Sequence, residues 1–277
     1  MKMKFTFFLF FLFFIPSCAK DKNFTIQNLN NNKISVFGHG GMGISHLYPM
    51  NSFEGIAQAL ALGADGTEID IQITSDSVLL GYHDKDLKEQ SNCVGFINDK
   101  TWNEIQKCTY VRQPYSNYHI ISLESLFSNI PNLHSYTFTF DCKLYINPSN
   151  NFKQYLESFA NAIVRIIEKY HLEENIFIES ENKDFLKILQ QKSSTLKLFI
   201  YPPSFGEGIK IAEELNLYGI TISIENINKE QMALAHSLGF RVAIWNTRTP
   251  KKNIQGIEKN PDFIQTDKLE HLLKILK

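Results

Sequence analysis

The chain has 277 residues, of which 43% are hydrophobic and 21% are charged. This length is enough for one large hydrophobic core. The formal net charge of −1 gives no global electrostatic reason to expect nucleic acid as a partner, and no pattern in the sequence sets an oligomeric state. A specific site, not bulk charge, must therefore determine what the protein binds.

Residues 1–18 predict an export signal. Lys2 and Lys4 precede an apolar run of about 11 residues, which is too short to span a bilayer core of about 30 Å. The run ends in Pro-Ser-Cys18, which resembles a bacterial lipobox and predicts a lipid on Cys18 that anchors the exported protein to a membrane, on the periplasmic side or at the cell surface. An ordinary cleaved signal with an incidental cysteine is the alternative. Residues 19–32 are polar and predict a flexible tether, and 33–277 form the folded domain.

Strand patterns and helix patterns then alternate along the chain. Such repeats predict parallel strands joined by helices, and their number, near eight, favours a closed α/β TIM (β/α)8 barrel over an open sheet. The expected strands are 35–38, 66–73, 136–142, 175–179, 196–200, 218–223, 240–245 and 262–265, with a further short strand before His83. The expected helices are 52–62, 152–170, 183–192, 207–216, 228–238 and 268–276.

The stretch 84–121 interrupts this alternation. It is polar, with one helical piece at 101–107, and predicts an insertion after the third strand, over the barrel mouth, and not a second core domain. Export would permit a disulfide, and Cys93 and Cys108 could close a loop or stay unpaired. Cys142 lies in an apolar strand pattern and predicts a buried thiol.

Carboxylates on two expected strands suggest a cation site. Glu68 and Asp70 are two positions apart on a strand, so they share a face, and the alternating isoleucines predict that this face points into the barrel. Asp141 adds a third inward carboxylate on another strand. Carboxylates that repel one another in a buried site are stabilised by a divalent cation with oxygen ligands. An exposed acidic hairpin is the alternative for Glu68 and Asp70 alone.

Two histidines follow expected strands at the same end of the barrel. His39 and His83 could serve as acid and base in cleaving a phosphodiester, because imidazole exchanges protons near neutral pH. Lys143, on the face of Asp141, could stabilise negative charge on the substrate. Glu179 ends a later strand on this side and is a candidate contact for the substrate's hydroxyl groups.

These residues stand in motifs that resemble the glycerophosphodiester phosphodiesterase family. The matching segments are His39-Gly-Gly, Pro49-Met-Asn-Ser, Gly63-Ala-Asp-Gly-Thr-Glu-Ile-Asp, His83-Asp, Ile121-Ser-Leu-Glu-Ser-Leu-Phe, Trp245-Asn and Thr266-Asp. The resemblance implies a metal-dependent phosphodiesterase that hydrolyses glycerophosphodiesters to glycerol 3-phosphate and an alcohol. It implies His39 and His83 as the acid–base pair, and one divalent cation, Mg or Ca, on the three carboxylates. The substrate would meet Lys143, Trp245 and the motif asparagine, Asn51.

Three residues depart from the family pattern. Gly40 replaces an arginine that contacts phosphate, Met50 replaces a glutamate, and Asp141 stands where Glu is usual. Arg112 in the insertion is a candidate substitute for the missing arginine. The segment Asp141-Cys-Lys143 also resembles the Asp-x-Lys motif of sphingomyelinase D and phospholipase D enzymes of the same superfamily. A non-catalytic surface lipoprotein that binds a phospho-ligand is a second alternative.

Overall fold

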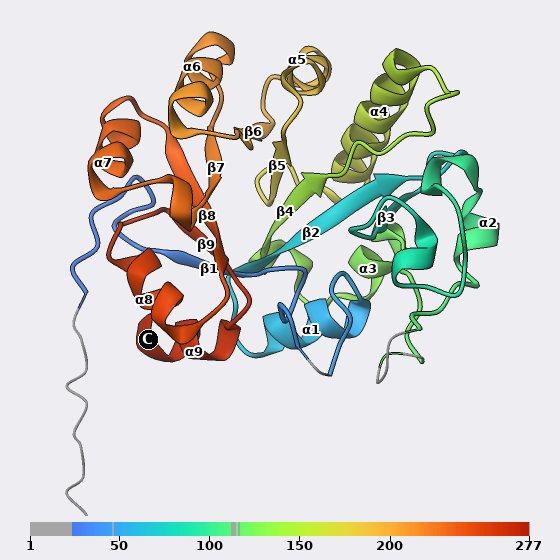
Figure 1. Cartoon of the computed structure of the whole chain (residues 1–277), viewed down its shortest axis with the longest axis horizontal. Coiled ribbons are helices and arrows are strands. Elements are labelled where there is room, and N and C mark those ends of the chain that lie inside the picture. Colours follow the sequence, from blue (N-terminus) through green and yellow to red (C-terminus); the bar gives the residue numbers. More distant parts are fainter. Residues whose placement is uncertain (1–23, 46, 112–114, 116, 277) are drawn as a thin grey trace, which may run out of the picture.

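A closed barrel of parallel strands forms the centre of the protein (Figure 1). The computed structural model describes residues 24–45, 47–111, 115 and 117–276. Strand β1 pairs with β9 on one side and with β2 on the other, which closes the ring and confirms the TIM (β/α)8 barrel. In order around the barrel, the parallel strands are β1 (Ser35–Gly38), β2 (Gly66–Ile73), β4 (Thr137–Cys142), β5 (Ile176–Ser180), β6 (Lys197–Ile200), β7 (Gly219–Ser223), β8 (Arg241–Thr247) and β9 (Phe263–Thr266).

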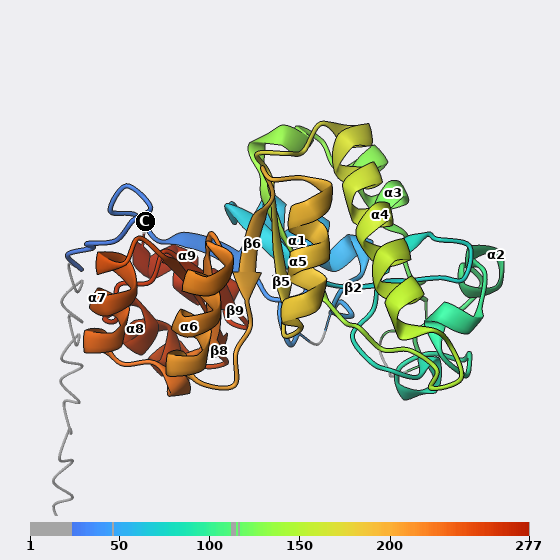
Figure 2. The same cartoon turned by 90° about the horizontal axis from the view of Figure 1, so that it is seen from above.

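Helices surround the barrel and bury one face against the strands (Figures 1 and 2). They are α1 (Phe53–Ala61), α3 (Leu123–Asn129), α4 (Phe152–Tyr170), α5 (Lys183–Lys192), α6 (Phe205–Leu215), α7 (Lys229–Ser237), α8 (Pro250–Ile257) and α9 (Leu269–Leu276). Polar caps fix where many of them begin, as when the side chain of Ser52 accepts from the Gly55 N–H. Helix α8 was not expected, because its sequence PKKNIQGI carries a weak apolar pattern; Pro at its start and the cap Thr249 favour it locally.

The barrel interior is divided into two levels. At the lower level four phenylalanine rings pack together from different strands, with centroid separations of 5.0–6.2 Å. Because strand side chains repeat with a period of two, the residue two positions further along each strand also faces inward, one level higher. The phenylalanines and the polar residues above them are Phe37 and His39, Phe177 and Glu179, Phe199 and Tyr201, and Phe263 and Gln265.

The short third strand is not part of the barrel wall. Strand β3 (Leu79–Gly81) is antiparallel to β2, so it forms a hairpin that returns the chain toward the mouth. The insertion follows, with helix α2 (Trp102–Ile105) and 3₁₀ turns at Leu87–Glu89 and Ile97–Asp99; further 3₁₀ turns elsewhere are Leu133–Ser135 and Ile224–Asn226.

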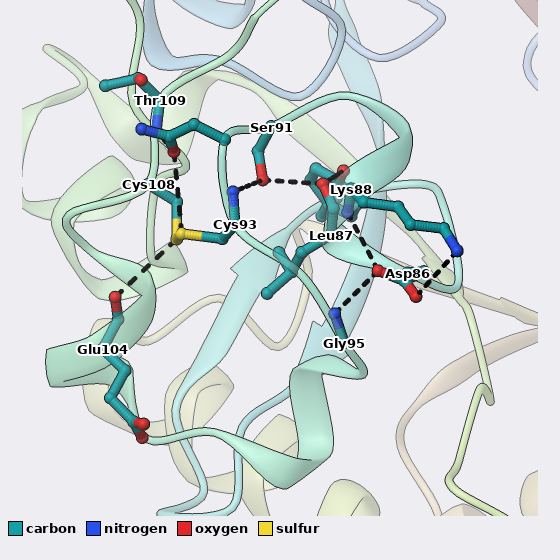
Figure 3. Close-up of a disulfide and its surroundings, with 11 residues drawn as sticks. Asp86, Leu87, Lys88, Ser91, Cys93, Gly95, Glu104, Cys108 and Thr109 are labelled. Carbon is teal, nitrogen blue, oxygen red and sulfur yellow. Dashed lines mark hydrogen bonds and ion pairs between the residues drawn. A yellow bond between two sulfur atoms is a disulfide. The ribbon is translucent and has the colours of Figure 1, made fainter.

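The insertion carries a small hydrophobic cluster that is separate from the main core. Leu80, Tyr82 and Leu87 are buried in this cluster. A disulfide joins Cys93 to Cys108 beside it (Figure 3). Cys142 is a buried free thiol, as the strand pattern predicted.

The expectation of a flexible tether over 19–32 is wrong for its second half. Asn28 donates a hydrogen bond to the Pro261 carbonyl at 2.7 Å, and Phe24 and Ile26 pack against the main core. Residues 24–32 therefore belong to the domain. The expected signal segment and Cys18 lie outside the described residues. Among the residues that are described, no helix is long and apolar enough to cross a membrane.

Candidate active site

Three carboxylates meet at the mouth of the barrel. Glu68 and Asp70 on β2 and Asp141 on β4 each place a carboxylate oxygen so that the three oxygens lie within 4.8 Å of one another. Asp70 and Asp141 are register partners on adjacent strands, which explains why residues far apart in the sequence converge here. The sequence-predicted group is therefore brought together.

Each carboxylate of β2 is held from behind by a hydrogen bond. The backbone N–H of Gly40 donates to Glu68 Oε2 at 2.8 Å. The amide of Asn51 donates to Asp70 Oδ2 at 2.8 Å and accepts from the Asp70 N–H at 2.9 Å. Asn51 has 1% of its surface exposed and lies outside the residues that line the cavity. The structure thus places Asn51 behind Asp70, not at the position of a substrate contact.

Lys143 lies between two of the carboxylates. Its ammonium is 2.8 Å from Asp141 Oδ2 and 3.1 Å from Asp70 Oδ1. Burial acts to lower the pKa of Lys143, but Asp70 and Asp141 outweigh it, and the pKa is raised. The charged form of the lysine is therefore favoured, and it neutralises part of the negative charge of the site.

Lys143 bridges Asp70 and Asp141 but not Glu68. Burial raises the pKa of Glu68 well above its usual value, and the charge of Asp70 adds to the rise. Glu68 Oε1 is buried and has no hydrogen-bond partner among the described residues. Such an atom is costly without a partner, and carboxylate oxygens are the ligands that Mg²⁺ and Ca²⁺ prefer. The donor set therefore fits a divalent cation.

Two histidines line the same cavity, and each is oriented by a carboxylate. His39 Nδ1 is 2.7 Å from Asp267 Oδ1, and its Nε2 is 3.9 Å from Glu68 Oε2. His83 Nδ1 is 2.9 Å from Asp84 Oδ1. A carboxylate at Nδ1 holds the proton there and leaves Nε2 of the neutral ring free to exchange a proton.

The electrostatics of His39 are dominated by its neighbours. Burial acts to lower its pKa, but the hydrogen bond to Asp267 and the charges of Glu68 and Asp70 raise it to about 9. The imidazolium form is thus stabilised by the same carboxylates that form the candidate cation site.

The far wall of the cavity carries polar side chains that can form hydrogen bonds with a ligand. Gln265 donates to Glu179 Oε1 at 2.6 Å, and burial followed by the charge of Asp141 raises the pKa of Glu179 to about 8. Trp245 Nε1 is buried without a hydrogen-bond partner in the described part of the protein, whereas the Thr221 hydroxyl interacts with Glu179 and acts to lower its pKa. Both residues line the cavity, so the indole N–H of Trp245 can donate to a bound ligand.

Arg248 is a cavity-lining residue that sequence reasoning missed. It follows β8, and its Nε is 3.7 Å from Asp267 Oδ2, while 57% of the side chain stays exposed. Its position just beyond the matched Trp245 motif was the one available signal. Arg112, the substitute suggested from sequence, lies outside the described residues.

The two sequence departures at Gly40 and Met50 fit each other. Gly40 has φ +56°, and a Cβ added there would lie 2.8 Å from Met50 Cε and 2.9 Å from Met50 Cβ. A larger side chain at position 40 would therefore require Met50 to move.

Together these residues enclose a cavity of about 130 Å³. Its walls combine carboxylates, two cations and two imidazoles, an arrangement that can bind a metal ion and an anion side by side. The lining residues are His39, Glu68, Asp70, His83, Asp141, Lys143, Glu179, Tyr201, Thr221, Trp245, Arg248 and Gln265.

The chain is similar to known phosphodiesterases. It is 25% identical over 249 residues to a glycerophosphodiester phosphodiesterase of Caldanaerobacter subterraneus subsp. tengcongensis, covering 88% of this chain and 98% of that one. It superimposes with a TM-score of 0.77 on an Oleispira antarctica phosphodiesterase solved with its product sn-glycerol-3-phosphate, at 16% identity and with 88% and 97% of the two chains covered. A glycerophosphodiester phosphodiesterase from Parabacteroides distasonis gives a TM-score of 0.74 at 23% identity, with the same coverage. These structural likenesses show the fold.

A sequence model of one family matches most of the domain. The model of the Glycerophosphoryl diester phosphodiesterase family matches residues 42–271, which include the three carboxylates, His83 and the late motifs. The chain therefore belongs to the glycerophosphoryl diester phosphodiesterase family and is a phosphoric diester hydrolase.

Proposed function

We propose that the protein hydrolyses glycerophosphodiesters to glycerol 3-phosphate and an alcohol, using His39 and His83 as acid and base. The observation that carries this proposal is the cavity in which two carboxylate-oriented imidazoles flank three converging carboxylates. The product bound to the Oleispira antarctica enzyme is of the class proposed here.

One Mg²⁺ or Ca²⁺ would be held by Glu68, Asp70 and Asp141. When bound, the cation supplies electrostatic stabilisation of charge on the phosphate oxygens. This assignment is supported by the donor set and by the partnerless Glu68 Oε1.

Side chains of the protein would transfer the protons and bind the substrate. One imidazole accepts the proton of the attacking oxygen at its free Nε2, and the other donates a proton to the departing alcohol. Arg248 and Trp245 would donate hydrogen bonds to phosphate oxygens from the wall of β8. Glu179, whose pKa is raised by burial, and Thr221 would contact the glycerol hydroxyls.

The test is a panel of glycerophosphodiesters and a lysophospholipid, with glycerol 3-phosphate measured as product. We expect the wild type to release glycerol 3-phosphate. Replacing His39 or His83 by Ala should lower kcat by about 10²–10⁴-fold, the usual range for a general acid or base. Unchanged turnover in either variant would overturn the mechanism. Binding of glycerol 3-phosphate without any turnover would favour a non-catalytic phospho-ligand protein.

We also propose that the protein is exported and anchored by a lipid on Cys18. A disulfide between Cys93 and Cys108 supports export, because disulfides persist in oxidising compartments. Labelling of cells with radioactive palmitate should mark the wild type and not a Cys18→Ala variant. Equal labelling of both, or of neither, would contradict the anchor.

A further inference from the structure

A second hollow opens beside the active-site cavity. It has a volume of about 340 Å³ and lies between the segment after β4 and the turn that joins β5 to α5. Asp141 and Lys143 line both this groove and the cavity, so the two spaces share these side chains at the candidate cation site. A group attached to a phosphate in the cavity would pass these two side chains to reach the groove.

Aromatic rings and one carboxylate distinguish the outer part of the groove. Tyr145 and Phe152 line it, and Phe152 leaves 42% of its surface exposed, which is unusual for a large apolar ring. Glu181, on the turn after β5, supplies an exposed carboxylate to the same wall. The rings offer π faces and the carboxylate offers a negative charge.

Glu181 lies close to both spaces. Burial raises the pKa of the Tyr145 and Tyr201 phenols, and the negative charge of Glu181 adds to the rise in each case. Tyr145 lines the groove and Tyr201 lines the cavity, so the carboxylate acts on aromatic residues of both.

Glu181 is exposed at the surface. Among the residues that the structure describes, none forms a salt bridge with it. Lys143, the cation at the inner end of the groove, is already bound to Asp70 and Asp141 at 3.1 and 2.8 Å. The outer groove therefore combines a free negative charge with aromatic faces, the combination that recognises an ammonium group.

We propose that this groove binds the alcohol moiety of the substrate and selects alcohols that carry an ammonium group. The proposal rests on the proposed phosphodiesterase function and adds the chemical class of the departing alcohol. Glu181 would attract the ammonium charge, and the rings of Tyr145 and Phe152 would contact its methyl or methylene groups.

The experiment compares kcat/KM for glycerophosphocholine with kcat/KM for glycerophosphoglycerol, whose alcohol is uncharged. We expect the wild type to favour the choline diester by about 10-fold, which corresponds to about 1.4 kcal/mol of discrimination. Glu181→Gln should reduce this ratio to near one, and Tyr145→Leu should reduce it in the same direction. The matched control is Glu173→Gln, which removes an exposed carboxylate before β5 and should leave the ratio unchanged.

The outcomes separate this proposal from the function on which it rests. If the wild type hydrolyses both diesters and Glu181→Gln leaves the ratio of the two kcat/KM values unchanged, the ammonium subsite is overturned. The phosphodiesterase function is not affected by that result. A wild type that hydrolyses neither diester overturns the function. In that case calorimetric titration with choline still tests whether the groove binds an ammonium group. Choline binding to the wild type that weakens about 10-fold in Glu181→Gln supports the ammonium subsite, and equal binding to both proteins overturns it.

Discussion

The two β2 carboxylates at the barrel mouth are each positioned by a neutral donor. Gly40 holds Glu68 through its backbone N–H, and Asn51 holds Asp70 through its side-chain amide. Each donor occupies one carboxylate oxygen, so the other oxygen is directed to the site. The asparagine that the motif predicted as a substrate contact therefore acts one layer behind the cavity, and such supporting residues tune the groups they hold.

Asp267 offers a test of how His39 is oriented. Its carboxylate accepts from His39 Nδ1 at 2.7 Å, and an amide in its place would weaken control of the ring's tautomer. Asp267→Asn should lower kcat by about 10–100-fold with little change in KM, in line with other supporting-shell losses. Steady-state kinetics on the folded variant, with its circular dichroism spectrum as control, check this. A variant that changes only KM would show that Asp267 acts on binding instead.

Arg248 offers a test of phosphate binding from β8. A charge-assisted hydrogen bond contributes about 1.5–3 kcal/mol, so Arg248→Ala should lower kcat/KM by about 10–100-fold and weaken inhibition by inorganic phosphate. Arg248→Lys should recover part of the loss. Lys251→Ala, an exposed cation on α8, is the matched control and should leave kinetics unchanged. Wild-type phosphate inhibition in Arg248→Ala would exclude the contact.

At the scale of elements, the β2–β3 hairpin explains how His83 reaches the site. Strand β3 runs antiparallel to β2 and pairs Gly81 with Ile71, so the chain returns to the level of Asp70. The insertion that follows is tied back to the barrel, where the Tyr110 hydroxyl donates to the Met50 carbonyl at 3.2 Å. The insertion therefore shapes one side of the mouth.

The disulfide should stabilise this insertion. Cys93 and Cys108 are 15 positions apart, and closing a loop of that length contributes about 3 kcal/mol in the chain-entropy treatment. Reduction, or the double substitution Cys93→Ser with Cys108→Ser, should lower the free energy of unfolding by about this amount in urea titrations. The double variant should no longer respond to reductant. A wild type whose unfolding is insensitive to reductant would contradict this contribution.

Elements with a strong periodic pattern were predictable from sequence, and those set by tertiary packing were not. The alternation over Gly66–Ile73 and the long amphipathic pattern of α4 gave a strand and a helix at the expected places. Helix α8 escaped because its sequence is polar and its buried positions include Asn253 and Gly256. The order of residues around the third strand did not reveal that β3 pairs antiparallel.

At the scale of the whole molecule, barrel closure decides which residues meet. The trio of carboxylates was predictable because Glu68 and Asp70 share a strand face and Asp141 follows on the next barrel strand. Arg248 was not, because it depends on two pairings: β8 with β9 places Arg248 beside Asp267, and closure of the ring between β9 and β1 places Asp267 beside His39. Contacts across the ring leave no local signature in the sequence.

The two levels of the barrel interior explain the stability of this arrangement. Packed phenylalanines fill the lower level, so the charged upper level lies on an apolar layer. In such an environment unpaired carboxylates are costly, and a bound cation relieves that cost. A cation bound at the three carboxylates would therefore stabilise the site.

Titration of a divalent cation into metal-stripped protein tests the central claim most directly. Glycerophosphodiester hydrolysis should be absent after EDTA treatment, return as one equivalent of Mg²⁺ or Ca²⁺ binds, and fail to return in Asp70→Asn or Glu68→Gln. Without metal, Glu68→Gln should be at least as stable as the wild type, because it removes a carboxylate whose pKa burial and Asp70 raise. Full turnover by the metal-stripped wild type, or full recovery in either variant, would contradict the account.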